Sequence, residues 1–348
     1  MLYSEAGVDI DAANKFVEKI KTLCSATIDF TKANPVVAGI GGFCSLYEVP
    51  GNPNQLLAAT TDGVGSKLNL ALKYREMGAL RPIGQDLVAM SVNDLITCGA
   101  TPLFFLDYLS VPRVNEPYLL DIIESIAKGC YYSRCVLIGG ETAEHPDMYG
   151  LNEMDMAGFA LGIVNRDKLY GPARVEEGDI LIGIQSSGPH ANGFTLIHKS
   201  PLIHDNPLDA LIKWCLVPTM LYEAPIRLIC DKHGDSIKAM AHITGGGLEA
   251  NIKRVIPEGL SIEVDWKSWS RPNAFDLIQD SLNIEEEEMR RVFNLGIGFV
   301  VIVKESGCYD IMDCMKTGLG FQCYKIGLVK KVTKKRNFLQ GVREWLAT

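Results

Sequence analysis

The sequence predicts an α/β protein, built of α+β layers and divided into two domains. Its 348 residues are about twice the length of a typical domain. Apolar runs of strand length alternate with segments of helical periodicity along most of the chain. This alternation is interrupted at residues 167–177, which are polar and contain Gly171 and Pro172. We therefore expect an N-terminal domain of residues 1–168 and a C-terminal α/β domain of residues 169–348.

In the expected N-terminal domain, an amphipathic pattern over residues 11–30 predicts the first helix. Residues 37–43 contain too many glycines for a helix or a strand interior, so we expect a mobile loop there. A break at Arg81 and Pro82 separates the next two helices. Apolar runs and periodicity predict strands at 55–61, 103–110, 135–139 and 156–164, and helices at 66–77, 83–98 and 117–131.

The expected C-terminal domain has the same style of alternation. Gly245, Gly246 and Gly247 predict a turn, and the basic residues at 330–336 are expected to form a solvated end. Strands are predicted at 179–185, 260–264 and 296–303, and helices at 208–214, at 223–233 and from the acidic residues 285–288 onward.

The composition disfavours several classes of function. With 47% hydrophobic and 22% charged residues, the chain is expected to fold as a soluble protein. A formal charge of −8 disfavours nucleic acid as a partner. No apolar stretch approaches the ~20 residues that cross a bilayer, and the acidic first residues do not resemble a signal peptide. The 10 cysteines have no CxxC or zinc spacing. We therefore expect a cytoplasmic protein with reduced thiols and no membrane partner.

The segment TTDGVGSKL, residues 60–68, has the residue types of a phosphate-binding loop in an unfamiliar order. It follows a predicted strand and precedes a predicted helix, which places Asp62 at the end of the strand. A carboxylate there can hold magnesium, and Lys67 can neutralise a phosphate oxygen. A simple Asp-Gly turn at Asp62 and Gly63 explains the segment equally well on its own.

The helix predicted at 83–98 carries its polar residues in one narrow stripe. Asp86, Met90, Asn93 and Thr97 lie within this stripe, Asp94 lies beside it, and almost all other positions are apolar or small. We therefore expect a buried helix whose polar stripe lines a cavity. These oxygen-bearing side chains suit magnesium. The alternative is an N-cap aspartate with buried polar groups that are hydrogen-bonded to the protein.

Three further loops place polar side chains after apolar runs. In LIGGETAE, Gly139 and Gly140 would let the backbone approach a ligand, and Glu141 would be a third carboxylate at a strand end. SSGPHANGF, residues 186–194, concentrates hydroxyls, a histidine and an amide, as substrate-binding loops do. HITGGG, residues 242–247, would present free N–H groups and a helix start to an anion. The alternatives are a glycine turn, a structural histidine and a flexible hinge.

Taken in order, these segments resemble the phosphoribosylformylglycinamidine cyclo-ligase family, also called aminoimidazole ribonucleotide synthetases. The resemblance rests on YSEAGVDIDAAN, GIGGF, TTDGVGSKL, IGQDLVAMSVNDL, GATPLFFLDY, GGETAEHPDMY, DMAGFALGIV, SSGPHANGF, HITGGGLEANIKRV and FNLGIGFVVIV. Each motif alone is weak, but their order is specific. They run from residue 3 to about residue 330, which is almost the whole chain.

The resemblance implies a two-domain PurM-like protomer, a homodimer whose N-terminal sheets combine across the interface, and sites for ATP and Mg²⁺. In the implied reaction of purine biosynthesis, ATP phosphorylates the formamide oxygen of formylglycinamidine ribonucleotide. An amidine nitrogen then attacks the activated carbon, the ring of aminoimidazole ribonucleotide closes, and phosphate leaves. Since an amide oxygen is a poor leaving group until it is phosphorylated, the protein would mainly position its substrates and neutralise charge.

The same resemblance divides the site residues into three sets. The metal would be held by Asp62, Asp86, Asn93, Asp94 and Glu141. ATP would contact these residues together with Gly39, Gly41, Gly42, Phe43, Gly63, Lys67, Gly139, Gly140 and Thr142, with the loop of Gly39 to Phe43 closing over it. The substrate and the transferring phosphate would contact Ser186, Ser187, Gly188, His190, Asn192, Thr244, Gly245, Gly246 and Gly247. His190 would handle a proton or stabilise an oxyanion, with His242 next in order and Lys67 assisting.

The sequence departs from the family pattern at two positions. Cys44 stands where glycine usually follows the loop phenylalanine, and Lys253 stands where proline commonly precedes the arginine at Arg254. A selenophosphate synthetase or a thiamine-phosphate kinase would share the carboxylate-rich half, but would not be expected to carry both SSGPHANGF and HITGGGLEAN. The retained polar residues disfavour a catalytically silent nucleotide-binding protein. A Rossmann dehydrogenase is disfavoured because no G-x-G-x-x-G follows an initial strand.

Overall fold

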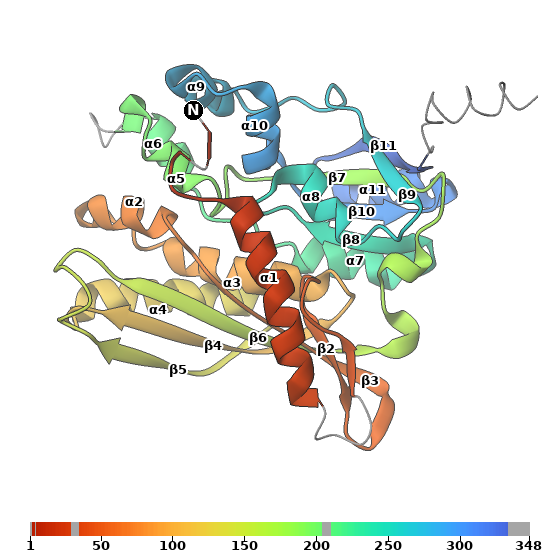
Figure 1. Ribbon diagram of the computed structural model, residues 1–348, viewed down its shortest axis with the longest axis horizontal. Coiled ribbons are helices and arrows are strands. Elements are labelled where there is room, and N and C mark those ends of the chain that lie inside the picture. Colours follow the sequence, from red (N-terminus) through yellow and green to blue (C-terminus); the bar gives the residue numbers. More distant parts are fainter. Residues whose placement is uncertain (1, 4, 29–34, 204–209, 333–348) are drawn as a thin grey trace, which may run out of the picture.

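Two β-sheets with associated helices organise the chain (Figure 1). The computed structural model describes residues 2–3, 5–28, 35–203 and 210–332, and every structural statement below concerns these residues. The basic residues 334–336, which we expected in a solvated end, lie outside them. The first sheet is built from residues 36–165 and the second from residues 180–331. The predicted break at 167–177 therefore falls between the two sheets.

The first sheet has six strands in the order β1-β2-β3-β6-β4-β5. They are β1 (Val36–Ala38), β2 (Ser45–Val49), β3 (Asn52–Gly63), β6 (Asp155–Asn165), β4 (Thr101–Val111) and β5 (Val136–Glu144). Neighbouring strands run antiparallel except β4 and β5, which are parallel because the helix α4 (Glu116–Tyr132) connects them. The helices α3 (Ile83–Ile96) and α4 cover one face of this sheet.

The packing of α3 explains why its sequence is apolar almost throughout. Nearly every residue of α3 is buried, including its polar stripe. Gly84 brings α3 against α4, because a Cβ at this position would lie 2.4 Å from the carbonyl oxygen of Ile122. Alternate residues of β6 are buried beneath α3, while the residues between them, such as Phe159 and Leu161, are only half-buried. The other face of the sheet therefore remains partly open.

The second sheet has five antiparallel strands in the order β8-β10-β7-β11-β9. They are β8 (Ile237–His242), β10 (Ile297–Val303), β7 (Ile180–Gln185), β11 (Cys323–Lys331) and β9 (Leu260–Val264). Every residue of β10 is buried, which accounts for its continuous apolar sequence. The helices α7 (Glu223–His233) and α11 (Cys308–Leu319) cover one face, and α8 (Gly247–Lys253) packs on the other.

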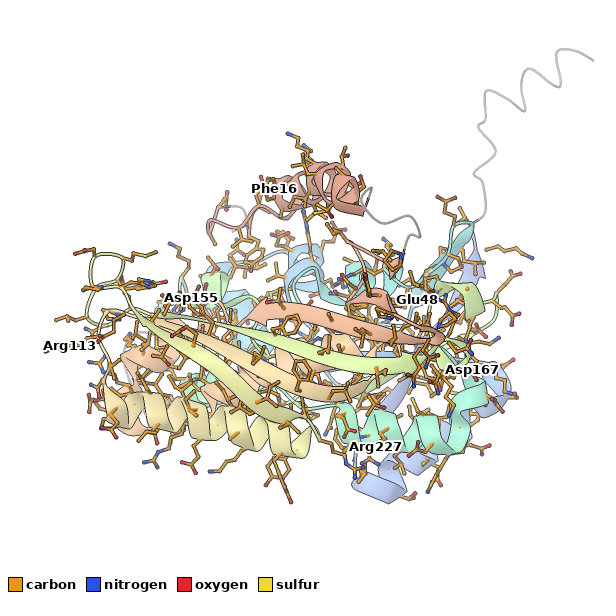
Figure 2. All side chains as sticks on the ribbon, turned by 90° about the horizontal axis from the view of Figure 1, so that it is seen from below. Phe16, Glu48, Arg113, Asp155, Asp167 and Arg227 are labelled. Atoms are coloured by element: carbon orange, nitrogen blue, oxygen red, sulfur yellow. The ribbon has the colours of Figure 1, made fainter. Side chains whose placement is uncertain are left out.

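The remaining helices surround these layers. They are α1 (Ile10–Ser25), α2 (Lys67–Lys73), α5 (Phe194–Ile197), α6 (Ala210–Leu216), α9 (Asn273–Leu282) and α10 (Glu286–Val292). The α1 helix begins after Asp9, whose side chain accepts from the Ala12 N–H at 2.9 Å. It crosses in front of both layers (Figure 1), on the side of the first sheet opposite α4 (Figure 2). Within the described ranges, no helix has the length and apolar character of a membrane span.

The residues before α1 pack on the second layer. The Tyr3 N–H donates to Oε1 of Glu288 on α10 at 2.6 Å. We assigned this segment to the N-terminal domain, but in space it is tied to the helices of the C-terminal half. It therefore reaches the junction of the two layers, where the largest described cavity lies.

Two strands are longer than the sequence predicted, and both corrections move site residues. β3 continues through Asp62 and Gly63 because they pair with Gly158 and Ala157 of β6. The strand predicted at 135–139 continues to Glu144 in pairing with β4, which also excludes the alternative of a glycine turn after 139. The sequence analysis also did not predict β1, β2, β8, β11, α5, α9 or α11.

Candidate active site

The largest cavity of the described chain lies between the two layers and has a volume of about 750 Å³. Its lining comes from distant parts of the sequence: the segment 61–66 at the end of β3, the start of β6 at 155–157, the loop 191–195, and Thr244 with Gly245. Tyr3 and Val8 from the N-terminal segment and Met90 of α3 complete it. Three of the predicted motifs, TTDGVGSKL, SSGPHANGF and HITGGG, therefore meet at one cavity.

Two carboxylates mark the inner end of this region. Asp62 pairs with Gly158 and points toward the helix-covered side of the sheet, where Asp94 projects from α3. Burial and the neighbouring charge of Asp94 raise the pKa of Asp62 to about 6, although its carboxylate accepts from the Gly63 N–H at 2.7 Å. Two carboxylates are thus held close together, as the sequence predicted for this pair.

His242 holds Asp94 in place. Its Nδ1 lies 2.8 Å from Oδ1 of Asp94, and its Nε2 lies 3.4 Å from Nδ2 of Asn93. The Asn93 amide oxygen accepts from the Tyr222 N–H, so the Asn93 nitrogen faces the imidazole as a donor. The Nε2 atom is then the acceptor, and Nδ1 donates its hydrogen to Asp94. His242 is fully buried, so it positions Asp94 and does not line the cavity.

Lys67 and Asp86 form a separate, fully buried ion pair, contrary to the predicted phosphate and metal contacts. The Lys67 Nζ lies 2.9 Å from Oδ1 of Asp86 and donates to the Val217 carbonyl oxygen at 2.6 Å. The same carboxylate oxygen accepts from the N–H and the hydroxyl of Thr219 at 2.8 and 2.5 Å. The pair therefore fastens α2 and α3 to residues 217–219, between α6 and α7, instead of facing the cavity.

Two other predicted metal ligands also lie away from Asp62 and Asp94 or are already occupied. The Asn93 amide donates to the Met220 carbonyl oxygen at 2.9 Å and is fully buried. Glu141 is exposed on β5, at the far edge of the sheet, and pairs with Tyr108 on its open face. Gly139, Gly140 and Thr142 lie on the same edge strand. Among described residues, no group of three histidine, cysteine or acidic side chains is arranged to hold a metal by itself.

Most polar side chains of the loop 186–194 are hydrogen-bonded to the protein, but His190 Nδ1 and Asn192 Nδ2 are buried without a hydrogen-bond partner. The Ser186 hydroxyl donates to Asn294 at 3.0 Å, and the Ser187 hydroxyl donates to the Pro218 carbonyl oxygen at 2.7 Å. His190 is fully buried, its Nε2 accepts from the Ser187 N–H at 3.3 Å, and burial holds its pKa well below its usual value. The predicted proton-handling role of His190 is therefore not supported by its position.

Asn192 is the residue of this loop that brings an unpaired polar side-chain atom to the cavity lining. Its side-chain oxygen accepts from the Gly245 N–H at 2.9 Å, which joins the two loops. Its Nδ2 atom is buried and has no hydrogen-bond partner. A buried donor without an acceptor is costly in a folded protein, so this amide is suited to a ligand oxygen.

The glycine turn at 245–247 is held by hydrogen bonds from the side chain of Asn251, a residue to which the sequence suggested no role. Its Nδ2 donates to the carbonyl oxygen of Gly247 at 2.8 Å. The predicted free N–H groups are partly used, since that of Gly245 donates to Asn192 and that of Gly247 to the Thr244 carbonyl oxygen. Gly247 has φ of +67°, and a Cβ there would lie 1.9 Å from the Arg290 carbonyl oxygen, so only glycine fits.

Arg254 connects the glycine-rich loop to the second layer, and it too was missed as a site residue. Its guanidinium donates to the Gly42 carbonyl oxygen and lies 3.9 Å from the centre of the Phe43 ring. Burial lowers the pKa of Arg254, while the charges of Asp94 and Asp62 oppose this effect. Gly42 and Phe43 line a second cavity of about 280 Å³, and no residue from Gly39 to Phe43 lines the larger cavity.

Comparison with known families and proteins gives consistent matches over most of the chain. Residues 36–164 match the family described as AIR synthase related protein, N-terminal domain, and residues 176–339 match the corresponding C-terminal domain. A phosphoribosylformylglycinamidine cyclo-ligase of Xanthomonas campestris pv. campestris (strain 8004) is 46% identical over 310 residues, which cover 87% of this chain and 89% of the relative. The enzyme of the same name from Xanthomonas oryzae pv. oryzae (strain PXO99A) is 46% identical over 312 residues, with the same coverage.

Solved structures share the fold at much lower identity. One is AaThiL complexed with AMPPCP and TMP, with a TM-score of 0.61, 16% identity and 90% of each chain covered. Another is E. coli HypE, a hydrogenase maturation protein, with a TM-score of 0.59, 17% identity, and 79% of this chain and 81% of that chain covered. At these identities the likeness extends to the fold alone.

Proposed function

This chain belongs to the phosphoribosylformylglycinamidine cyclo-ligase family, and from that premise we propose how its cleft performs the reaction. The protein is an ATP-dependent cyclo-ligase that converts formylglycinamidine ribonucleotide into aminoimidazole ribonucleotide in purine biosynthesis. The observation that carries the proposed site is the cavity of about 750 Å³ between the layers, where the polar loops of both halves meet beside two carboxylates.

The reaction needs a site that holds two anionic molecules in a fixed position relative to each other. A phosphoryl group must pass from ATP to the formamide oxygen, after which the amidine nitrogen reaches the activated carbon. Such a reaction is accelerated mainly by orientation and by neutralisation of phosphate charge. We assign both substrates to the large cavity, whose size lies within the usual range for small-molecule sites.

We place Mg²⁺ at Asp62 and Asp94, a smaller set than the sequence suggested. The raised pKa of Asp62 expresses the repulsion and desolvation that a divalent cation would relieve. Magnesium commonly uses one or two carboxylates together with phosphate oxygens and water, so these two side chains fit it without further protein ligands. When bound, the ion would neutralise phosphate charge. Asp86 is paired with Lys67 through Oδ1 and does not line the cavity, although its Oδ2 has no hydrogen-bond partner; Asn93 is hydrogen-bonded to the protein, and Glu141 lies on another strand edge.

The remaining site residues then divide into contacts and supports. Asn192 would donate to a substrate oxygen through its unpaired Nδ2, and Thr244 lies beside it in the lining. His242 would keep the Asp94 carboxylate oriented. Ser186, Ser187, Gly188 and His190 would support the loop, because their hydrogen bonds are with protein groups and none of the four lines the cavity.

We assign the glycine-rich loop the role of a lid that Arg254 holds. The Arg254 guanidinium contacts the loop at Gly42 and Phe43. It also lies close enough to Asp62 and Asp94 for their charges to raise its pKa against the effect of burial. Because one side chain links the loop to the carboxylates, a ligand that changes the charge there would also change the hold on the loop. This arrangement would couple nucleotide binding to loop position.

We further propose that the enzyme acts in the cytoplasm as a homodimer, with domains of residues 1–168 and 169–348. The open face of the first sheet supports the dimer, because Phe159, Leu161 and Ile163 are only half-buried there and Leu103 and Tyr108 are 39% exposed. Apolar residues on a half-covered sheet favour packing against a second sheet. Sedimentation velocity should give a dimer, and Phe159→Glu should shift it toward monomer.

The direct test incubates the purified protein with ATP, magnesium and formylglycinamidine ribonucleotide. We expect aminoimidazole ribonucleotide and ADP in equal amounts. Thiamine phosphate, offered as an alternative phosphoryl acceptor, should give no ADP above background. A folded dimer that makes no imidazole product, or that releases ADP equally with both acceptors, would contradict the proposal.

A further inference from the structure

Two buried thiols face each other behind the glycine-rich loop. Cys44 follows Phe43 and precedes β2, and Cys98 follows the C-terminal end of α3. Their Sγ atoms are 3.6 Å apart, with the Cys44 thiol directed at the Cys98 sulfur, and the side chain of Cys98 also contacts the Leu95 carbonyl oxygen at 3.3 Å. Cys44 stands where the family pattern has glycine, so the pair depends on this chain's own departure from the family.

The pair lies on the second cavity, of about 280 Å³, and not on the large one. The lining of this smaller cavity includes both cysteines together with Phe43, Tyr170 and Arg254. A cavity of about 10–15 Å³ on the same scale already holds a water molecule. A small hydroperoxide therefore has room to reach the sulfurs, although each cysteine is less than a tenth exposed.

We propose that Cys44 and Cys98 are an oxidation site, at which a small hydroperoxide converts the two thiols into a reversible disulfide. A disulfide requires about 2.0 Å between the sulfurs, so they must approach by about 1.6 Å. Rotation of two side chains that already touch supplies a movement of this size. The bond would join residues 54 positions apart in the sequence.

Cys98 is the sulfur that reacts first. The hydrogen bond from Cys44 lowers the pKa of Cys98 and raises that of Cys44, while burial acts to raise both. The Cys98 thiolate attacks the terminal oxygen of the hydroperoxide and the O–O bond breaks, and the leaving oxygen takes up the proton that Cys98 lost, so that an alcohol leaves, or water when the oxidant is hydrogen peroxide. The Cys44 sulfur then attacks the resulting sulfenic acid, the S–O bond breaks, and water leaves with the Cys44 proton. Two thiols lose two electrons, and one hydroperoxide is reduced.

The position of the bond gives it a consequence for the enzyme. Cys44 is the residue after the Arg254-bound Phe43, and Cys98 lies in the turn that follows the helix carrying Asp94. A disulfide would therefore tie the end of the glycine-rich loop to the helix of the carboxylate pair. Resting on the proposed lid role of this loop, the bond would restrict loop movement and slow turnover.

The test oxidises the purified enzyme with hydrogen peroxide, blocks the remaining thiols with iodoacetamide and maps the peptides by mass spectrometry. We expect a cross-linked peptide that contains Cys44 and Cys98 and is lighter by two hydrogens than its reduced parts. Turnover should fall several-fold and recover with dithiothreitol. Cys44→Ala should keep its turnover in peroxide.

Cys130 and Cys135 provide the matched control, because they form a second contacting thiol pair at the turn between α4 and β5, away from the loop. Cys130→Ala should remain as sensitive to peroxide as the unaltered chain. A cross-link at Cys130 and Cys135 alone, no cross-link while the exposed Cys24 is oxidised, or an inactivation that Cys44→Ala does not prevent would overturn the proposal. A disulfide that forms without slowing turnover would refute its effect on the loop. An enzyme inactive even when reduced would count against the proposed function, since mass spectrometry detects the bond independently.

Discussion

Two charged residues of the motif TTDGVGSKL, Asp62 and Lys67, lie in two regions that differ in how charge is paired and in whether a ligand has room. Asp62 lies beside Asp94, so two like charges meet next to a cavity of about 750 Å³. Lys67 lies against Asp86, so opposite charges meet with both side chains fully buried. The first region has unbalanced charge and space for a ligand, whereas the second is neutral as a pair and filled. We infer that charged side chains without a partner of opposite charge indicate the ligand site, and that paired, buried charges serve the stability of the fold.

The largest effect that separates the two regions is expected from Lys67→Met. Removing the ammonium leaves Asp86 buried without its partner, and such losses cost about 3–5 kcal/mol of unfolding free energy. Urea unfolding would measure this loss of unfolding free energy. Turnover per folded molecule should change much less, because Lys67 does not line the cavity.

The double variant Lys67→Met, Asp86→Asn supplies the control for this prediction. An amide at residue 86 removes the orphaned charge and keeps an acceptor for the Thr219 N–H and hydroxyl, so much of the stability should return. If Lys67→Met instead leaves stability intact and abolishes turnover, Lys67 serves phosphate, as the sequence alone suggested.

Asp94→Asn should have the next largest effect, on turnover and not on stability. The amide still accepts from His242, but it removes a charge that we assign to magnesium. Loss of one such electrostatic contact typically lowers the rate by about 10²–10³-fold. Steady-state ADP release and thermal unfolding should be compared with those of Asp121→Asn, a carboxylate on α4 that makes a surface contact with Arg81. A large fall in melting temperature with normal turnover would make Asp94 part of the scaffold.

A smaller effect is expected for Asn192→Asp, which replaces the unpaired donor with an acceptor and adds a negative charge to the cavity lining. The aspartate keeps an oxygen for the Gly245 N–H, so the junction of the two loops should survive. Loss of one hydrogen bond to a charged substrate group costs about 1.5–3 kcal/mol, which is roughly ten- to a hundred-fold in kcat/KM. Asn192→Ser, which retains a donor on a shorter side chain, should lose less. Unchanged kinetics in both variants would exclude Asn192 from substrate binding.

The sequence predicted most helices and the strands of the first sheet that surround the site, because their apolar periodicity is local. It also predicted that Asp62 and Asp94 would lie close together, because the motif TTDGVGSKL places Asp62 at a strand end and the helical period places Asp94 with the polar residues of α3. It could not predict that Asp86 would be neutralised, because Lys67 and Thr219 reach it from distant segments. Burial of His190 and the placement of Glu141 on an edge strand likewise depend on packing and strand pairing, which polar motifs do not encode. Arg254 was missed for the same reason: its loop partners lie in the other half of the chain.

The smallest effect that still distinguishes the two regions is the pH dependence of stability at Asp62. Its folded-state pKa of about 6 lies above the ordinary value of 3.8. A carboxyl group with a raised pKa contributes stability when protonated, so this contribution is fully present below about pH 4 and is lost as the pH rises to about 6. Above pH 6, the ligand-free protein carries two repelling carboxylates.

Magnesium should relieve this repulsion, and more so at neutral than at acidic pH. We therefore expect added Mg²⁺ to raise the melting temperature by a few degrees at pH 7.5 and by less at pH 5, where Asp62 is protonated and cannot bind the ion. In Asp62→Asn the shift should be small at both pH values. Lys67→Met should keep the difference between the two pH values, because its ion pair lies outside the cavity. An equal shift at both pH values in the unaltered chain would mean that magnesium binds elsewhere. The regions of Asp62 and Lys67 would then differ only in how deeply their charged side chains are buried.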